Sequence, residues 1–225
     1  MDIQTIMAAT VHDVKNSLGL IDSQLNDVIK RLHGSDPGSA QEIRLIQLEC
    51  NRINNGMVHM LGFYKLDQGT FSPNFSDVMV ADVVIDATSR YTEMLVSLGV
   101  SLSIRFADGD DECVWYLDAN LIEGLLGNIV TNSIRYTKSQ LIFDIGVIDG
   151  WLNIRMTDDG GGFPNAMLTL LDQPEQLSFQ SGATGLGLYF CQEIAKLHTN
   201  EERKGFINLS NDEQTGGAIF NLWLP

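Results

Sequence analysis

Apolar residues recur at alternating steps of three and four along the first third of the chain. The first run ends at residue 32 and comprises Met7, Val11, Val14, Leu18, Ile21, Leu25, Val28 and Leu32. A second run with the same steps follows a Gly/Ser/Pro-rich breaker at residues 34–39 and comprises Ile43, Ile46, Cys50, Ile53, Met57, Met60 and Tyr64. Such heptad spacing is typical of helices that pack along one seam. Residues 2–67 are therefore predicted to form an antiparallel helical hairpin.

A hairpin of two long helices leaves apolar flank uncovered on both arms. A second copy of the chain would cover these flanks across a two-fold axis and complete a four-helix bundle. We therefore expect a homodimer. The alternative is that the hairpin packs against the rest of its own chain.

The pattern becomes mixed after residue 68. Helices are predicted at residues 80–98, 119–136 and 186–197, and strands at 101–106, 113–116, 141–147, 151–157, 205–210 and 218–224. Strands that arrive in consecutive pairs indicate a mixed or antiparallel sheet and not a doubly wound one. The predicted fold is α+β: an N-terminal helical hairpin (1–68) that forms a dimeric four-helix bundle, followed by an α/β sandwich domain with a mixed sheet (69–225).

Charge and composition exclude several classes of protein. The formal net charge of −15 argues against non-specific nucleic-acid binding, which needs clustered Lys and Arg. The three cysteines, Cys50, Cys113 and Cys191, are scattered and lack the spacing of a disulfide framework or a zinc site. The chain has neither a basic, apolar leader nor an apolar run long enough to span a membrane. We expect a cytoplasmic protein with no membrane segment in this chain.

One histidine near the start combines exposure with polar neighbours. If the seam residues face inward, His12, Asp13 and Asn16 lie on the solvent side of the first helix, with His12 and Asn16 one turn apart. A neutral imidazole beside a carboxylate is a nucleophile with a base close by. The alternative for this segment alone is an ordinary solvated helix face.

Two amides share one face of the helix predicted at residues 119–136. Asn128 and Asn132 are four residues apart, and Arg135 and Tyr136 follow within a turn. Amide oxygens on one face can bind a hard cation such as the Mg²⁺ of a nucleotide, and Arg135 could contact a phosphate. Such an Asn pair is also common as a solvated or capping feature.

Two glycine-rich turns follow further along the chain. Asp158, Asp159 and three glycines at residues 160–162 come directly after a strand, so the backbone there can approach a flat ligand while a carboxylate accepts from an amino group. The segment Gly-Ala-Thr-Gly-Leu-Gly-Leu at residues 182–188 opens a helix, where exposed amide groups attract phosphate. Each turn alone is weak evidence, but the order of all three segments is hard to obtain by accident.

Together these segments resemble the transmitter core of two-component sensor histidine kinases. Residues 11–18 resemble the H-box of that family, Asn-Ile-Val-Thr-Asn-Ser-Ile-Arg-Tyr at residues 128–136 its N-box, and the two glycine-rich turns its nucleotide boxes. The ending, Gly-Gly-Ala-Ile-Phe-Asn-Leu-Trp-Leu-Pro, resembles the closing strand of the family. The resemblance implies a dimerisation and histidine phosphotransfer hairpin at 1–68 and a GHKL-type ATP-binding domain at 69–225.

The resemblance also implies residue roles. His12 would accept the γ-phosphate of ATP, Asp13 would orient the ring and take its proton, and Asn16 occupies the position used in family members with phosphatase activity. Mg²⁺ and ATP would be held by the residues of the other boxes: Asn128 and Asn132 for the metal, and Arg135, Tyr136, Asp158, Gly160, Gly162, Thr184, Gly185, Leu186 and Gly187 for the nucleotide. The phosphoryl group would then pass to an aspartate of a response-regulator receiver domain. Because few residues precede the H-box, the signal is expected from a longer parent protein or from a separate sensor in trans.

The chain departs from the family pattern at several positions. Ser17 replaces a proline that is usual after the H-box, which would affect helix bending. Asp159 replaces a usual asparagine, and its extra negative charge near the site is expected to weaken nucleotide affinity. The lid at residues 164–181 has only Phe163 and Phe179 in place of a clear Phe-x-x-Phe box. Two rival functions stay open: a phosphotransfer protein of the same architecture that no longer uses ATP, and a non-catalytic or serine-directed ATP-binding switch.

Overall fold

The computed structural model describes residues 3–32, 35–69, 71–107, 112–168 and 186–225. It divides into two compact units, residues Met1–Ser72 and Pro73–Pro225. In the described ranges, no helix is long and apolar enough to cross a membrane.

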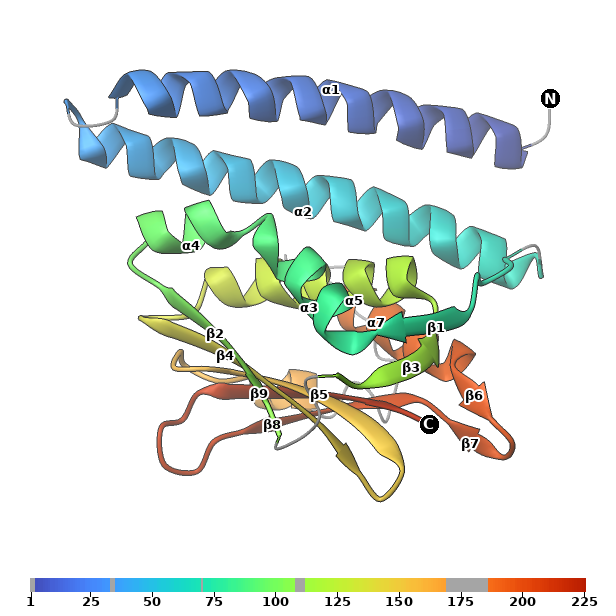
Figure 1. Cartoon of the computed structure of the whole chain (residues 1–225). Helices are drawn as coiled ribbons and strands as arrows, with labels where there is room; N and C mark the ends of the chain where they lie inside the picture. Colours follow the sequence, from blue (N-terminus) through green and yellow to red (C-terminus); the bar gives the residue numbers. More distant parts are fainter. Residues whose placement is uncertain (1–2, 33–34, 70, 108–111, 169–185) are drawn as a thin grey trace. The chain divides into compact units, whose positions relative to one another are not determined.

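The first unit is the predicted helical hairpin. Helix α1 (Ile3–Leu32) and helix α2 (Pro37–Asp67) lie side by side and run in opposite directions (Figure 1). Asp36 caps the start of α2, where its carboxylate accepts hydrogen bonds from the Ser39 amide at 3.1 Å and the Ser39 hydroxyl at 2.6 Å. A capping carboxylate followed by proline at the first helical position is a strong helix start, which fixes where α2 begins.

The contact between the two helices differs from the predicted seam. The buried residues outside the predicted heptad runs are Ile29, Ala40, Gln47 and Leu48, and the exposed residues within those runs are Ile21, Ile46, Ile53 and Met60. The Gln47 amide nitrogen donates to the side-chain oxygens of Asp22 and Asn26, at 3.0 Å each, so its burial is compensated by hydrogen bonds. Several apolar side chains of this unit, by contrast, stay exposed in the single chain: Ile6, Leu20, Ile21, Leu45, Ile46, Ile53, Val58 and Met60.

The second unit is built on a five-stranded sheet. Its strand order is β2 (Ser101–Phe106), β4 (Gln140–Ile148), β5 (Trp151–Asp158), β9 (Ala218–Leu224) and β8 (Phe206–Asn211). Strands β2 and β4 are parallel, and all the other neighbours in this sheet are antiparallel. The mixed sheet is thus confirmed, with strand bounds within one or two residues of the prediction.

Two small ribbons were not predicted. Strand β1 (Ser76–Met79) pairs with β3 (Val114–Leu117), and β6 (Thr199–Asn200) pairs with β7 (Arg203–Lys204). The three strands that were not predicted, β1, β6 and β7, have only two to four residues each, which is too short for an alternation of apolar and polar residues to be recognised in the sequence.

Helices cover one face of the sheet. Helices α3 (Val80–Ser89), α5 (Ala119–Ile134) and α7 (Leu186–Leu197) lie on the same side of the strands (Figure 1). Side chains alternate along β4 and β5, and those on the covered face are buried: Leu141, Phe143, Ile145, Leu152, Ile154 and Met156. The α/β sandwich is therefore confirmed, with its core between this face and the helices. The remaining short helices are α4 (Thr92–Ser97) and α6 (Asn165–Leu168).

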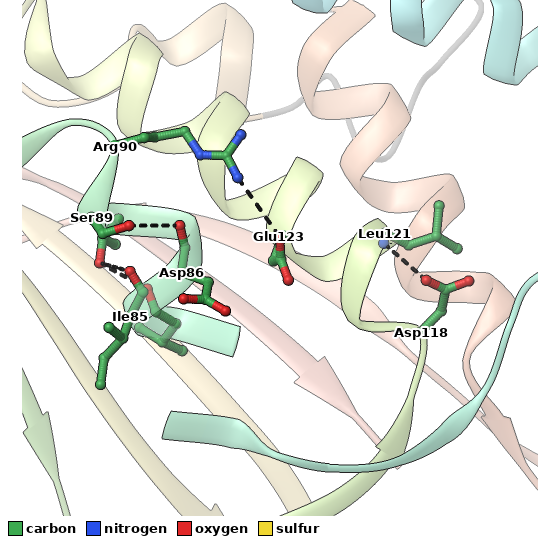
Figure 2. A network of polar contacts seen from close by, with 9 residues as sticks. Ile85, Asp86, Ser89, Arg90, Asp118, Leu121 and Glu123 are labelled. Carbon is green, nitrogen blue, oxygen red and sulfur yellow. Dashed lines mark hydrogen bonds and ion pairs between the residues drawn. The ribbon is translucent and has the colours of Figure 1, made fainter. Parts of the chain in front are cut away.

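The single helix predicted at residues 80–98 is wrong, because the structure divides it into α3 and α4. The Ser89 hydroxyl donates to the Asp86 carbonyl (Figure 2), and the Thr88 hydroxyl lies within hydrogen-bond distance of two carbonyl oxygens three and four residues earlier. Such bonds weaken helix propagation. The chain bends at Arg90 and Tyr91. This bend buries Tyr91, whose hydroxyl accepts a hydrogen bond from Thr131 of α5 at 3.2 Å.

The predicted cap of α5 is confirmed. One carboxylate oxygen of Asp118 accepts from the Leu121 amide at 3.1 Å (Figure 2), and the other accepts from the Asn74 amide. The Asp118 amide donates to His198 Nε2 at 3.2 Å, and His198 Nδ1 lies 2.9 Å from the Ile194 carbonyl. Buried His198 therefore joins the end of α7 to the start of α5.

Candidate functional site

His12 lies on the exposed side of α1. Its side chain is 71% exposed and that of Asp13 is 82% exposed, whereas Val11 beside them is buried. His12 Nδ1 lies 3.3 Å from the Asn16 amide nitrogen and 3.6 Å from the Asp13 carboxylate. The structure thus brings the three predicted residues together around an imidazole that solvent can reach. Ser17 donates to the Asp13 carbonyl at 3.0 Å within the continuous helix.

The four predicted N-box residues lie in and just beyond α5. Asn128 is buried, and its amide nitrogen donates to Cys191 Sγ of α7 at 3.4 Å. Asn132 is half-buried one turn later. Arg135 and Tyr136 follow the last helical residue and are both exposed. The two asparagine amides therefore lie in the packed part of the helix, and the Arg135 and Tyr136 side chains lie in solvent at its C-terminal end.

The carboxylate of Asp158 is buried at the end of β5. One of its oxygens accepts from the Gly160 amide at 2.8 Å and from the Ala218 amide at 3.1 Å. Two backbone amides on one oxygen fix the carboxyl group in a single orientation. A carboxylate held in this way can accept a hydrogen bond from a ligand amino group.

The glycines of the predicted site make close contacts inside the protein. A Cβ on Gly160 would lie 2.5 Å from the Tyr136 carbonyl oxygen, and a Cβ on Gly187 would lie 2.8 Å from the Asn128 amide nitrogen. Gly162 has a φ of +75°. Its missing Cβ leaves room for Asn211, which accepts from the Phe163 amide at 2.7 Å. These contacts bring both glycine-rich segments against α5 or its C-terminal end, and room for a nucleotide at the same glycines stays a prediction.

The Asp159 carboxylate accepts hydrogen bonds from the turn before β4. Burial alone raises the pKa of Asp159, but hydrogen bonds from the Ser139 hydroxyl and from the backbone amides of Ser139, Gln140 and Lys138 outweigh it and hold the pKa well below its ordinary value. The Ser139 hydroxyl donates at 2.6 Å and its amide at 3.0 Å. The carboxylate therefore stays ionised and is fixed by the turn before β4, and its effect on nucleotide affinity stays a prediction.

Three predicted features lie partly or wholly outside the described residues. These are Thr184, Gly185 and the greater part of the lid with Phe179. Leu186 begins α7, but only its backbone is described.

Sequence reasoning missed three residues that support the site. Cys191 contacts Asn128, Ala218 donates to Asp158, and a Cβ on Gly217 would overlap the Asp158 carbonyl oxygen. A signal for Cys191 existed, because it is four residues after Gly187 and therefore on the same face of α7. Gly217 belongs to a Gly-Gly pair before the last strand, which was noted only as part of the ending.

The donor set of this region suits a hard cation bound with phosphates. Asn128 and Asn132 supply amide oxygens, which are acceptable ligands of Mg²⁺. In the part of the chain that the structure describes, no cluster of three or more His, Cys, Asp or Glu residues could hold a metal by itself. Any cation here would therefore depend on the amides, water and the nucleotide.

The chain is similar in sequence to known ATPases and histidine kinases. Residues 117–225 match the family of histidine kinase-, DNA gyrase B- and HSP90-like ATPases. The chain is 24% identical over 236 residues to the sensor histidine kinase CpxA of Escherichia coli strain K12, covering 99% of this chain and 47% of that protein. It is 27% identical over 197 residues to the signal transduction histidine-protein kinase AfsQ2 of Streptomyces coelicolor, covering 84% of this chain and 34% of that protein. The chain thus spans half or less of the length of these relatives.

Solved structures have the same fold. The catalytic domain of histidine kinase ThkA superposes with a TM-score of 0.56 at 18% identity, covering 68% of this chain and 95% of that one. Acinetobacter baumannii histidine kinase AdeS superposes with a TM-score of 0.54 at 18% identity, covering 86% of this chain and 96% of that one. The chain therefore resembles a histidine kinase transmitter core, and its residues 117–225 match the histidine kinase-, DNA gyrase B- and HSP90-like ATPase family.

Proposed function

We propose that this chain is an ATP-dependent protein-histidine kinase that phosphorylates His12. The observation that carries the proposal is the exposed His12, with Asp13 and Asn16 beside it, in the same chain as an ATPase domain of the histidine kinase-like family. The two relatives reported above, which match most of this chain, are named as histidine kinases. Phosphoryl transfer depends mainly on positioning and charge neutralisation, which these residue types can supply.

The nucleophile of the proposed reaction is Nε2 of His12. In the tautomer with its proton on Nδ1, which faces the Asp13 carboxylate, Nε2 carries the lone pair and is the nitrogen assigned to attack the γ-phosphorus. An N–P bond forms, the bond between the γ-phosphorus and the bridging oxygen breaks, and ADP leaves. The proton on Nδ1 passes to the Asp13 carboxylate, which acts as general base.

The nucleotide is assigned to the second unit. Asp158 would accept from the adenine amino group through the oxygen that is not bonded to Ala218, and Arg135 would contact phosphate oxygens. Tyr136 and the glycine-rich segments would border the nucleotide. When bound through Asn128 and Asn132, Mg²⁺ would neutralise phosphate charge.

The phosphoryl group would pass from His12 to an aspartate of a response-regulator receiver domain. In the reverse function, Asn16 would position a water molecule against the phosphorylated receiver, which would give phosphatase activity. The signal would come from the rest of a longer sensor or from a separate sensor protein. These partners rest on the family resemblance and on the exposure of His12.

We also propose a homodimer formed through the hairpin. The apolar side chains that α1 and α2 leave exposed in one chain, among them Leu20, Ile46, Ile53 and Met60, would be covered in a four-helix bundle. Light scattering after size-exclusion chromatography should give twice the chain mass. A monomer at micromolar concentration would contradict this part of the proposal.

Labelling with γ-³²P-ATP tests the central claim. The wild-type chain should incorporate label that is lost in acid, since phosphohistidine is acid-labile, and His12→Gln should incorporate none. Asp158→Asn should abolish nucleotide binding, and Gln24→Ala, an exposed change on the same helix, should retain labelling. Acid-stable label would favour a serine-directed switch, and folded protein that binds no ATP would favour a phosphotransfer protein.

A further inference from the structure

Asn128 is enclosed by two residues of α7. The side chain is 6% exposed, so its amide is held inside the protein. Gly187 and Cys191, one helical turn apart on α7, contact it. The Cβ that Gly187 lacks would lie 2.8 Å from the amide nitrogen, 2.9 Å from the amide oxygen and 3.3 Å from the carbon between them. The carbon is the farthest of the three atoms, so Gly187 lies beyond the edge of the amide that carries its nitrogen and oxygen, and a side chain there would displace both.

Cys191 distinguishes the two ends of that amide. The Asn128 nitrogen donates to Cys191 Sγ at 3.4 Å, and the thiol lies 4.0 Å from the Leu125 carbonyl, to which it can donate. The Cys191 side chain is completely buried, so water does not compete for its sulfur. Because an amide carries its nitrogen and oxygen on opposite sides, a nitrogen fixed at Cys191 directs the oxygen away from the sulfur.

This orientation matters for a metal ligand. Mg²⁺ binds amide oxygen and not amide nitrogen. An asparagine whose two ends could exchange would present the wrong atom for part of the time, and groups that orient metal ligands commonly contribute 10- to 100-fold, as a rough guide, to metal affinity.

We propose that Cys191 is a positioning residue for magnesium-dependent nucleotide binding: its sulfur holds the nitrogen of the Asn128 amide so that the oxygen is presented to the cation. The inference rests on the proposed function, because it takes Asn128 as a ligand of the Mg²⁺ that accompanies ATP. It assigns a role to a cysteine that neither binds the metal nor reacts.

Three substitutions separate this role from simple core packing. Cys191→Ala and Cys191→Val both remove the hydrogen-bond acceptor, but one reduces the volume of the side chain and the other enlarges it. Cys191→Ser keeps an acceptor at nearly the original size. A packing role predicts that the variants follow side-chain volume, whereas the positioning role predicts that they follow the acceptor.

The measurement is the magnesium enhancement of nucleotide affinity. Isothermal titration with the β,γ-imido analogue of ATP gives a dissociation constant in excess Mg²⁺ and another in chelator, and their ratio is compared among the variants. We expect the ratio to fall about tenfold, the low end of the range for such groups, in Cys191→Ala and Cys191→Val. It should stay near the wild-type value in Cys191→Ser, and affinity in chelator should be equal in all four proteins.

Each outcome decides between the claims. A wild-type ratio in both Cys191→Ala and Cys191→Val overturns the positioning role and leaves the kinase proposal intact. A ratio that follows volume, together with a lower melting temperature, also overturns it in favour of packing. Wild-type protein that binds no nucleotide, or binds it without any enhancement by Mg²⁺, refutes the proposed nucleotide site itself and the role of Cys191 with it.

Discussion

Replacement of Gly217 tests how tightly the glycine-rich turn after β5 is packed. A Cβ at this position would overlap the Asp158 carbonyl oxygen and would lie 2.9 Å from the carbonyl carbon and 3.3 Å from the Asp159 Cα. All of these atoms belong to the backbone, so Gly217→Ala can be accommodated only by a shift of the main chain. Overpacking costs about 1–3 kcal/mol, and we expect the upper end here, about 3 kcal/mol. In a unit of this size that lowers the melting temperature by about 6–12 °C.

The same shift should weaken nucleotide binding. It moves the Ala218 amide, which holds the Asp158 carboxylate. Thermal unfolding followed by circular dichroism measures the first effect, and titration with an ATP analogue measures the second. Gly161→Ala is the matched control, because its Cβ would meet no atom within 4 Å, and it should melt at or slightly above the wild-type temperature. Equal melting temperatures for the two variants would refute the reasoning from close contact.

Three further predictions concern buried or hydrogen-bonded polar groups. Gln47→Glu places a carboxylate where an amide now donates to Asp22, so it should destabilise the hairpin at neutral pH by about 1–3 kcal/mol and recover on acidification, as measured by thermal unfolding. The folded-state pKa of Asp159 lies below its unfolded value near 3.8. The stability that this carboxylate contributes is therefore complete above pH 3.8 and is lost as pH falls. Urea unfolding should show that the difference in stability between wild type and Asp159→Ala shrinks below about pH 4. Burial lowers the pKa of His198 from 6.5, although the Ile194 carbonyl and Asp118 oppose the shift. Wild type should therefore lose stability below pH 6.5, whereas His198→Gln should change less. Parallel curves of unfolding free energy against pH for the two proteins would contradict this.

The spacing of apolar residues was sufficient to predict the helices with a clear helical period and the strands with strict alternation. The bounds of α7 and β9 were predicted to the residue, and the cap at Asp118 was recognised because a carboxylate preceded an apolar helical run. The division between α3 and α4 could not be predicted in the same way. It depends on Tyr91 reaching the Thr131 hydroxyl, and that contact joins residues 40 positions apart.

The candidate site was predictable as a set of motifs but not as a set of contacts. His12 was expected on the solvent side because its neighbours in the seam face inward, and its exposure confirms this. Asp159 was predicted as a charge near the nucleotide, but nothing in the sequence connects it with the turn at Ser139 that donates hydrogen bonds to it. Cys191 lacked the spacing of a disulfide or a zinc site, so only its position one turn after Gly187 connected it with the site, and the contact of its sulfur with Asn128 could not be predicted.

Helices α5 and α7 are joined by contacts at both ends of α7, one of which involves the proposed metal ligand Asn128. Near the start of α7, Gly187 and Cys191 enclose Asn128. At its other end, His198 Nε2 accepts from the Asp118 amide where α5 begins. Because the helices are joined at both ends, α7 cannot move along α5 without breaking one of these contacts. Changes at Cys191 and His198 should therefore be coupled in a double-mutant cycle of nucleotide affinity, and additive effects would show that each end acts alone.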